Sequence, residues 1–497
     1  MSNNIKNIII NKLNTEETLT FDENERSFLK QNIKNVFDDE MSLIDAAFIG
    51  KDTYSQNEFN LWKGLNPYRV KEIYKQIVNI EFMYGMFNSA IDNNYITFPS
   101  PLSDNTVKSS TSFAATNTVF FRFYDQGEVF YLSQHYNFID TLFFPKRNLI
   151  ISFDGGGLAW ENEIKHLGRM IVYKFDDYIT AVNDKEKTFG GIIVSDESPY
   201  HFFYNHLFCT ELLYEEKILH KIKKIFIMEK EWYYFDLEKL YKECDFHLNI
   251  FTDKHINAIE NIAKNREFYL NAVLLQKRIP KQSIRTSFKR VTETAPLLIS
   301  NDFKAIIDDV KHYSPIVWMG ITGQKRSWVE QEEGYANIIA RLHEKYPNIA
   351  IIMDGWTLGK YDEAYCKSNG NIQKDMQVVE NIKALIDDDI PLFNIVGRSS
   401  IEKISIGNLV DFFIANNGTG SMHIDAICMR PGITHISNSF RKSSILGHIS
   451  YSQNLIAEEK VTDLETDSEF NHIGHYSINW EDIMAMVNTL TNQLDHV

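Results

Sequence analysis

The chain has 497 residues, of which 44% are hydrophobic and 24% charged, so it is a globular protein too long for a single core. Its 51 basic and 67 acidic side chains give a net charge of −16, which argues against a nucleic-acid partner. The four widely spaced cysteines favour reduced thiols over a disulfide frame or zinc site, as expected in the cytoplasm. We find no signal peptide and no apolar run of membrane-spanning length, while peripheral membrane contact stays open.

The first 110 residues show apolar side chains at helical spacing. They recur every three to four positions in Glu23–Val36 and in Tyr68–Ile91, which predicts helices there. The segment 103–118 is rich in Ser, Thr and Asn and predicts a loop. We therefore expect residues 1–110 to form an N-terminal helical region.

Residues 111–290 alternate between strand-like and helical patterns, which predicts an α/β domain. A helix is expected at Pro199–Lys221, and the charged residues from about 250 to 290 predict a helical passage to the next domain. Short apolar runs predict strands at 119–123, 129–132, 149–153, 192–194 and 225–227.

Residues 291–497 alternate more regularly and predict a parallel Rossmann-like sheet with a C-terminal helix at Trp480–Leu490. The expected strands are Ile316–Gly320, Ile349–Met353, Leu392–Val396, Leu409–Ala415 and Ile433–Ile436. The expected helices are Gln331–Lys345, Val378–Ile386, Ile401–Ile406 and Ser421–Met429.

Polar residues follow the first two of these strands, at the sheet edge where open parallel sheets bind ligands. The first strand leads into a loop with small, hydroxyl and cationic residues suited to phosphate, although a solvated basic turn is the alternative. The second strand leads into a carboxylate that could hold a ribose or a base, or into a plain turn. The residues are Gly320, Thr322, Gln324, Lys325 and Arg326 in the first loop, and Asp354 and Gly355 in the second.

A glycine-rich loop follows the fourth strand and leads into a predicted helix. Such a loop lets backbone approach a ligand closely, and a helix N-terminus suits an anion such as a nucleotide diphosphate. An ordinary strand-to-helix turn is the alternative. The predicted donor residues here are Asn416, Asn417, Gly418, Thr419, Gly420 and Ser421, followed by His423, which either contacts the donor or packs the helix.

These three loops, with Pro431-Gly432 before the next strand, resemble the nucleotide-binding domain of GT-B fold glycosyltransferases over about residues 310–440. The resemblance implies two Rossmann-like domains facing a cleft. Residues 291–497 would bind a nucleotide-sugar, and residues 111–290, with the N-terminal region, would hold the acceptor. The chain lacks the paired glutamates of many retaining members and a strand-end D-x-D. Both absences favour an inverting enzyme that needs neither metal nor cofactor.

Two residues are candidates for the general base in the acceptor half. His201 follows Ser198, a possible N-cap, and Pro199, so it lies in the first turn of the predicted helix, whose field favours the neutral imidazole. Asn205 would share its face, and a capping or packing histidine is the alternative. Asp154 precedes three glycines at a strand end and is the second candidate, unless the segment is only a flexible turn.

The sequence thus predicts a cytoplasmic glycosyltransferase that moves a sugar from a nucleotide-sugar to a saccharide or glycoconjugate acceptor. Its Asn, Ile and Lys usage indicates a bacterium, and a bacterial surface glycan is the expected acceptor. A sugar-nucleotide epimerase is one alternative, because it uses the same fold without an acceptor. A non-catalytic GT-B-like partner of a glycosyltransferase is the other.

Overall fold

A computed structural model describes residues 65–494, apart from the internal gaps given next. The residues left out are 116–117, 148, 154–166, 169–170, 172–174, 185, 251–263, 276–277, 325, 360–361, 419, 443–453, 465–473 and 495–497. The chain divides into two compact units. Unit 1 comprises Met1–Lys230 and Tyr241–Ser283, and unit 2 comprises Glu231–Leu240 and Ile284–Val497.

The N-terminal region is helical only in part. The predicted helix at Tyr68–Ile91 is two helices, α4 (Pro67–Ile77) and α5 (Ile80–Asn93), because Asn79 interrupts it and caps the second through the Glu81 N–H. An antiparallel pair, β1 (Ile96–Pro99) and β2 (Thr106–Ser109), follows. The predicted loop at 103–118 is therefore wrong in part, and the predicted helix at Glu23–Val36 lies outside the described residues.

Unit 1 contains an antiparallel sheet that the alternating pattern did not distinguish from α/β structure. Its five strands pair in chain order. Gln126 and Gly127, with φ of 50° and 77°, make the tight turn between its second and third strands, as two-residue hairpins require. The strands are β3 (Ser112–Ala115), β4 (Thr118–Asp125), β5 (Glu128–Gln134), β6 (Thr141–Phe144) and β7 (Leu149–Ser152).

A second sheet of unit 1 is fully parallel, in the order β10-β9-β8-β11. The chain builds β8, β9 and β10 outward and then places β11 on the other side of β8, so the strand order reverses between β8 and β11. The predicted helical passage at 250–290 is wrong where β11 lies. The strands are β8 (Thr188–Ile193), β9 (Lys224–Ile227), β10 (His247–Ile250) and β11 (Glu267–Asn271).

The helix predicted at Pro199–Lys221 is confirmed from Pro199 to Glu215, but the width of its turns changes along its length. It begins as one turn, α8 (Pro199–His201), widens into the π-helix η2 (Phe202–Leu207), and ends as α9 (Phe208–Glu215). Ser198 stands at the N-cap but its side chain makes no capping bond, and Asp196 Oδ1 accepts the Ser198 N–H instead. The other helical segments of unit 1 are η1 (Pro145–Arg147), α7 (Phe175–Asn183) and η3 (Leu219–Lys221). The segment Glu231–Leu240, which belongs to unit 2, contains most of η4 (Lys230–Trp232) and all of α10 (Leu237–Leu240).

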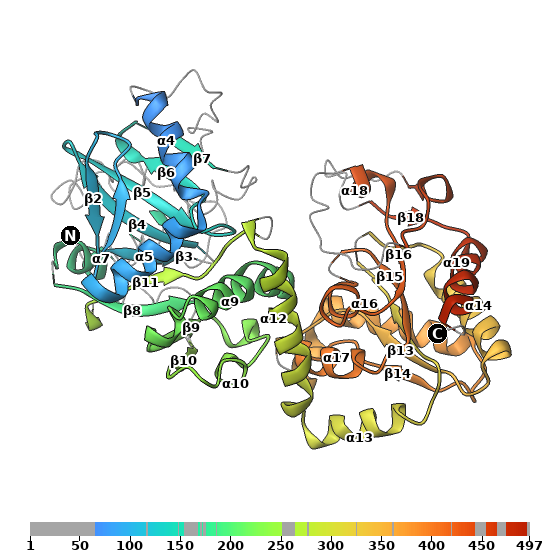
Figure 1. The fold of residues 1–497 in the computed structure, drawn as a ribbon. Coiled ribbons are helices and arrows are strands. Elements are labelled where there is room, and N and C mark those ends of the chain that lie inside the picture. Colours follow the sequence, from blue (N-terminus) through green and yellow to red (C-terminus); the bar gives the residue numbers. More distant parts are fainter. Residues whose placement is uncertain are drawn as a thin grey trace, which may run out of the picture. The chain divides into compact units, whose positions relative to one another are not determined.

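Unit 2 confirms the predicted Rossmann-like sheet, whose five strands are all parallel in the order β14-β13-β12-β15-β16 (Figure 1). Every residue of the three central strands is buried, so the sheet is covered on both faces. The strands are β12 (Ile316–Gly320), β13 (Ala350–Asp354), β14 (Leu392–Asn394), β15 (Phe412–Asn416) and β16 (Gly432–His435).

The predicted helices of unit 2 are present, although the one predicted at Val378–Ile386 begins at Gly370 and the one predicted at Ser421–Met429 is a π-helix. One face of the sheet forms a core with α14, α16 and α19, to which Val317, Tyr335 and Val487 contribute. The helices are α12 (Lys281–Thr294), which begins in unit 1, η6 (Ala295–Leu297), α13 (Asn301–Val310), α14 (Gln331–Lys345), α15 (Glu363–Ser368), α16 (Gly370–Leu385), α17 (Ser400–Gly407), η7 (Met422–Ile427), α18 (Asn438–Lys442), η8 (Glu458–Lys460) and α19 (Trp480–Leu494).

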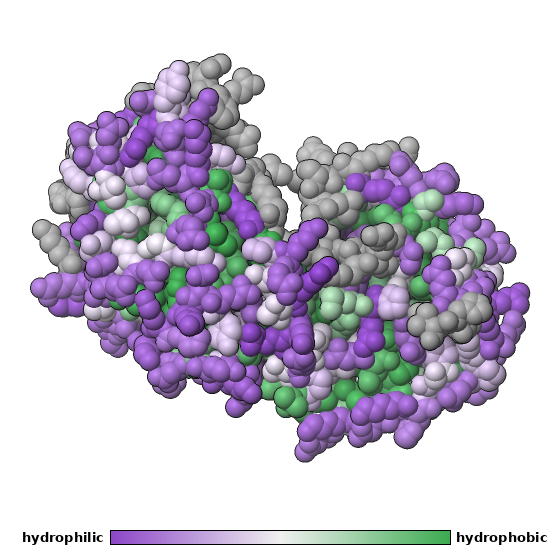
Figure 2. Space-filling view, in the orientation of Figure 1, coloured by the Kyte–Doolittle hydropathy of each residue, from purple (hydrophilic) through white to green (hydrophobic). Residues whose placement is uncertain are grey.

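The short antiparallel pair β17 (Thr462–Asp463) and β18 (Tyr476–Ser477) completes the described strands. Hydrophilic side chains cover most of the face that Figure 2 shows, with smaller apolar areas between them. Among the described residues, no helix is long and apolar enough to cross a membrane.

Candidate functional site

The sheet of unit 2 has one edge where a ligand site is expected on topology alone. The strand order reverses between β12 and β15, and open α/β sheets bind ligands in the crevice beyond the carboxyl ends of the strands at such a point. The loops that leave these two strands contain most of the predicted donor residues. The structure therefore brings the loop after Gly320 and the loop after Asn416 together at this edge.

Asn416 joins the two loops. Its Nδ2 donates to the Arg326 carbonyl oxygen at 2.9 Å and to the Tyr476 hydroxyl oxygen at 2.8 Å. Arg326 has a left-handed φ of 54°, and its guanidinium lies 4.6 Å from the centre of the Phe440 ring. Burial lowers the pKa of Arg326 below its ordinary value, although the residue remains a cation at neutral pH. Arg326 is thus a partly buried cation rather than a solvated basic turn.

A second layer of polar contacts supports Asn416 from behind. The Tyr476 hydroxyl lies 2.7 Å from His435 Nδ1, and the Tyr335 hydroxyl donates to the Gly320 carbonyl at 2.8 Å. Burial lowers the pKa of His435 to about 3, so this imidazole is neutral. Gly320 is a packing position, because a Cβ there would lie 2.7 Å from the Ala415 Cβ. These contacts fix the ends of β12 and β15 before any ligand binds.

The glycine-rich loop is shaped by its backbone. Gly418 has a φ of 121°, which other residues rarely adopt, and the Asn417 N–H donates to the His435 carbonyl. The helix predicted at Ser421–Met429 is present as the six-residue π-helix η7 (Met422–Ile427), and Ser421 makes no side-chain capping bond. Gly420 lies in the same turn, while Thr419 lies outside the described residues.

The loop after β12 is anchored by its neighbours. The Thr322 backbone exchanges two hydrogen bonds with the Gln331 side chain, and Gln324 Nε2 donates to the Asn371 carbonyl at 3.4 Å. Asp375 binds the same loop, because its Oδ1 accepts the Gly323 N–H at 2.7 Å. Lys325 lies outside the described residues, so its predicted contact with phosphate stays a prediction.

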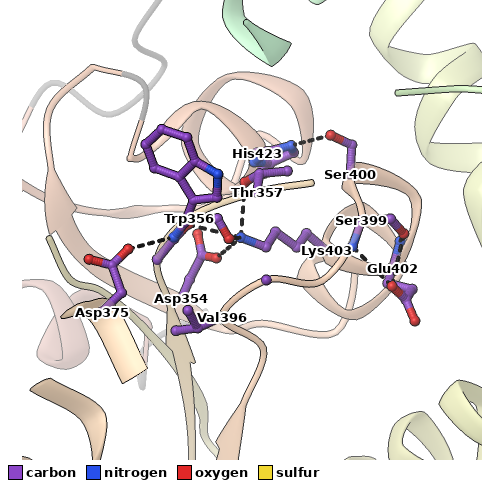
Figure 3. Close-up of polar contacts among 12 residues, drawn as sticks. Asp354, Trp356, Thr357, Asp375, Val396, Ser399, Ser400, Glu402, Lys403 and His423 are labelled. Atoms are coloured by element: carbon purple, nitrogen blue, oxygen red, sulfur yellow. Dashed lines mark hydrogen bonds and ion pairs between the residues drawn. The ribbon is translucent and has the colours of Figure 1, made fainter. Parts of the chain in front are cut away.

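Asp375 also holds the loop after β13, as Figure 3 shows. Its Oδ2 accepts the Trp356 N–H at 2.7 Å, so one carboxylate connects two loops of the ligand edge. Gly355 leaves room for this contact, because a Cβ there would lie 2.7 Å from Asp375 Oδ2. The Trp356 side chain is 36% exposed beside this carboxylate. An aromatic surface is therefore fixed at the end of β13.

Lys403 of α17 lies at the centre of a buried polar group (Figure 3). Its Nζ is 2.5 Å from Asp354 Oδ1 and donates to the Gly355 carbonyl, the Trp356 carbonyl and the Thr357 hydroxyl, each at 2.9 Å. Burial raises the pKa of Asp354 to about 6, against the opposing effect of Lys403. The carboxylate predicted to hold a ribose or a base is instead paired inside the protein, so we assign Asp354 an internal role.

His423 takes the packing role rather than the donor-contacting one. Its Nε2 lies 3.0 Å from the Ser400 hydroxyl, and the side chain is buried (Figure 3). Burial, with the nearby Lys403 cation, lowers the pKa of His423 well below its ordinary value. The helix that carries Lys403 and Ser400 starts with a capping box of Ser399 and Glu402. The Ser400 end of this contact is therefore fixed by the start of its helix.

The candidate base His201 lies beyond the carboxyl ends of the parallel strands of unit 1. Asp196, three residues past β8, is fully buried, and its pKa is raised by burial and lowered by the nearby His201 and His135. His201 Nδ1 lies 3.0 Å from Asn205 Oδ1, which confirms that these two side chains share a face. The second candidate, Asp154, lies outside the described residues.

Comparisons with known proteins give only distant likenesses. No protein-family model matches the chain, and no curated protein matches it. Among solved structures, ADP-heptose lps heptosyltransferase II from E. coli is 11% identical over 61% of this chain and 99% of its own, with a TM-score of 0.33. UDP-GlcNAc 2-epimerase from Methanocaldococcus jannaschii is 14% identical over 68% of this chain and 84% of its own, with a TM-score of 0.26.

A glycosyl transferase family 9 protein from Veillonella parvula is also similar, at 10% identity over 52% of this chain and 68% of its own, with a TM-score of 0.20. Glycosyltransferases are thus among the structures that this chain resembles, as the sequence resemblance predicted. At such identities and TM-scores the likeness says nothing of substrate or activity.

Sequence reasoning missed the residues that hold the ligand edge in place. Asp375 and Lys403 lie in helices and contact loops 52 and 48 positions away, so no local pattern links them to the site. One signal was available for Lys403, because it is a cation followed by apolar and small residues in a short helix. In the described part of the chain, no three His, Cys, Asp or Glu side chains are grouped so as to hold a metal ion.

Proposed function

We propose that the protein is a glycosyltransferase that binds the nucleotide-sugar donor at the β12–β15 edge of unit 2. The observation that carries the proposal is a partly buried cation, Arg326, in the loop after β12 at the point where the strand order reverses, with its carbonyl bonded by Asn416 of β15. Asn416 and Asp375 hold these loops through short hydrogen bonds. A fixed cation beside a glycine-rich turn suits the diphosphate of a nucleotide-sugar.

The residues of unit 2 divide into contacting and supporting groups. Arg326 and Lys325, with the backbone of the 416–421 loop, offset the negative charge that develops on the leaving diphosphate. Trp356 offers an aromatic surface to the base of the nucleotide. Asp354 and His423 support the loops from inside and do not contact the donor.

The acceptor binds unit 1 at the carboxyl ends of β8 and β11. His201 Nε2 takes the proton of the acceptor hydroxyl, whose oxygen forms the new bond to the anomeric carbon. The bond from that carbon to the diphosphate breaks, and its electron pair leaves with the nucleotide. Attack opposite the leaving group inverts the anomeric carbon and requires no metal or cofactor. Asp154 is the alternative base, and a saccharide of a bacterial surface glycan is the acceptor.

Thermal stabilisation by nucleotide-sugars tests the donor site. A ligand at about 100 times its Kd adds about 2.7 kcal/mol to the free energy of unfolding, which raises the melting temperature measurably. UDP-, GDP-, ADP- and CMP-sugars are compared, and one class should stabilise the protein and be turned over with a saccharide acceptor. No stabilisation by any of them would refute the proposal. Turnover without an acceptor would indicate the epimerase, and binding without turnover the non-catalytic partner.

Replacing Arg326 by alanine locates the site. Losing a charge-assisted contact to phosphate costs about 1.5–3 kcal/mol, so the Kd for the donor should rise by about one to two decades. Arg341→Ala is the matched control, because Arg341 is exposed on α14 and pairs with Glu344 of the same helix. Calorimetry should show normal donor binding by the control. Equal binding by both variants would contradict the assignment.

A further inference from the structure

The amide of Asn205 has only one orientation that satisfies its contacts. Its Nδ2 lies 3.2 Å from the Tyr136 carbonyl and 3.2 Å from the Leu274 carbonyl, and both of these groups can only accept. Exchanging the amide oxygen and nitrogen would place an oxygen against two carbonyl oxygens. The Asn205 Oδ1 is therefore the atom that faces His201.

This orientation determines which nitrogen of His201 carries the proton. Asn205 Oδ1 can only accept, and it lies 3.0 Å from His201 Nδ1. The neutral imidazole has one donor and one acceptor nitrogen, so Nδ1 must be protonated and Nε2 must carry the lone pair. Nε2 is the nitrogen that can take a proton from a substrate.

Two neighbouring aromatic rings also restrict the position of the His201 imidazole. Its centre lies 4.3 Å from the centre of the Tyr136 ring and 5.1 Å from that of Tyr200. The π-helix η2 begins directly after His201, and such widened turns often occur at functional sites. Asn205 lies in that π-helix and contacts both the His201 ring and the two carbonyls.

The two carbonyls that fix Asn205 come from different sheets of unit 1. Tyr136 follows β5 of the antiparallel sheet, and Leu274 follows β11 of the parallel sheet. The strand order of the parallel sheet reverses between β8 and β11, and His201 follows β8. The Leu274 N–H also donates to the Asn205 carbonyl, so the backbone of the π-helix is tied to the end of β11. These contacts place the His201–Asn205 pair at the ligand edge of this sheet.

We propose that Asn205 is the positioning residue that holds His201 in the Nδ1–H tautomer, so that Nε2 acts as the base toward the acceptor hydroxyl. The proposal rests on the proposed function for the identity of the substrate, but the tautomer itself does not. The proton released by the acceptor passes to Nε2, and the Nδ1–H bond to Asn205 persists as the ring becomes cationic. Asn205 contacts no substrate in this step.

Nitrogen-15 NMR of the imidazoles tests the tautomer without any substrate. At a pH where His201 is neutral, its Nδ1 should have the chemical shift of a protonated nitrogen and its Nε2 that of an unprotonated one. His206 is an internal reference, because its Nδ1 lies 2.9 Å from the Ala272 carbonyl and must be a donor. Signals are assigned with His201→Gln and His206→Gln variants. An Nε2–H tautomer at His201 in the wild type would overturn the inference.

Two variants connect the tautomer to turnover. Asn205→Leu removes the acceptor, so His201 should shift toward the Nε2–H tautomer and kcat should fall about tenfold or more, with the donor KM unchanged. Asn205→Asp keeps an acceptor toward His201 and adds a negative charge, so the Nδ1–H tautomer should remain and the acid limb of the pH–rate profile should move to higher pH. Its second oxygen replaces the donor to the Tyr136 and Leu274 carbonyls, so the melting temperature of this variant should fall. Circular dichroism and the melting temperature establish that each variant is folded.

The outcomes separate this inference from the proposed function. A wild-type Nδ1–H tautomer with a slow, folded Asn205→Leu variant supports the role of Asn205. Full glycosyl transfer by His201→Gln would overturn the inference and leave the transferase standing. Absence of nucleotide-sugar binding by the wild type would instead refute the proposed function, while the NMR result would still report the tautomer.

Discussion

Replacing Lys403 with methionine tests whether the buried ion pair with Asp354 stabilises the ligand edge of unit 2. The Lys403 side chain is fully buried, and its Nζ contacts one carboxylate, two carbonyls and one hydroxyl. Methionine keeps much of the side chain's length but removes the charge and the donors. Removing one member of a buried pair leaves the other charge uncompensated, so the free energy of unfolding should fall by about 3–5 kcal/mol.

The loss should depend on pH because Asp354 can take up a proton. Burial raises the pKa of Asp354 to about 6 in the folded protein, above the ordinary 3.8. A carboxyl with a raised folded pKa lowers folded stability as pH rises, so its penalty develops between about pH 4 and pH 6 and amounts to about 3 kcal/mol above that. Without Lys403 the pKa should rise further and the penalty should grow. The variant should therefore differ least from the wild type near pH 4–5 and most at pH 8.

Urea denaturation at pH 5 and pH 8 measures this difference. Lys367→Met is the matched control, because Lys367 pairs with Glu363 on the surface of α15 and should change stability little at either pH. The double variant Lys403→Met/Asp354→Asn removes both charges and should recover part of the loss at pH 8. A loss at pH 8 no larger than that of the control, or one that does not change with pH, would refute the reasoning.

The remaining predictions concern catalysis and the loops of the donor site. His201→Ala should reduce turnover by about 10²–10⁴-fold with donor affinity little changed, whereas Asp154→Asn should affect acceptor use less. Steady-state kinetics measure both variants. An inactive Asp154 variant beside an active His201 variant would show that Asp154 is the base. Asp375→Ala removes two short hydrogen bonds to loop N–H groups, so calorimetry should show a donor Kd about tenfold higher or more, and an unchanged Kd would mean that the loops hold their shape without it.

Unit 2 could be predicted closely because its elements are periodic and locally consistent. The sequence prediction for β12 and α14 has the bounds found in the structure, since a buried parallel strand is a short apolar run and a surface helix repeats every 3.6 residues. Unit 1 was harder because its two sheets use similar apolar runs. The strand β11 was taken for a helix, although its Phe268-Tyr269-Leu270 core has the aromatic character of a strand.

The ligand edge of unit 2 was only half predictable for a different reason. The residues predicted there follow strand ends, and topology brings strand ends together. The supporting groups come from helices and act at long range, as Asp375 does toward Gly323 and Trp356. Pairing also changes a residue's role. In the sequence, Asp354 has the properties of a ligand-binding carboxylate, but in the structure it forms a buried ion pair with Lys403.

Burial distinguishes the histidine that could exchange protons from those that support structure. His206 lies in the same π-helix as Asn205, but it is fully buried, and its pKa is lowered to about 3, so it stays neutral and donates to a carbonyl. His423 and His435 are buried in unit 2 and bind a serine and a tyrosine hydroxyl. His201 is only partly buried and is held by a neutral amide rather than enclosed. A general base requires an imidazole with a fixed tautomer and a ring that substrate can reach, and among these four histidines the contacts of His201 fit the proposed role best.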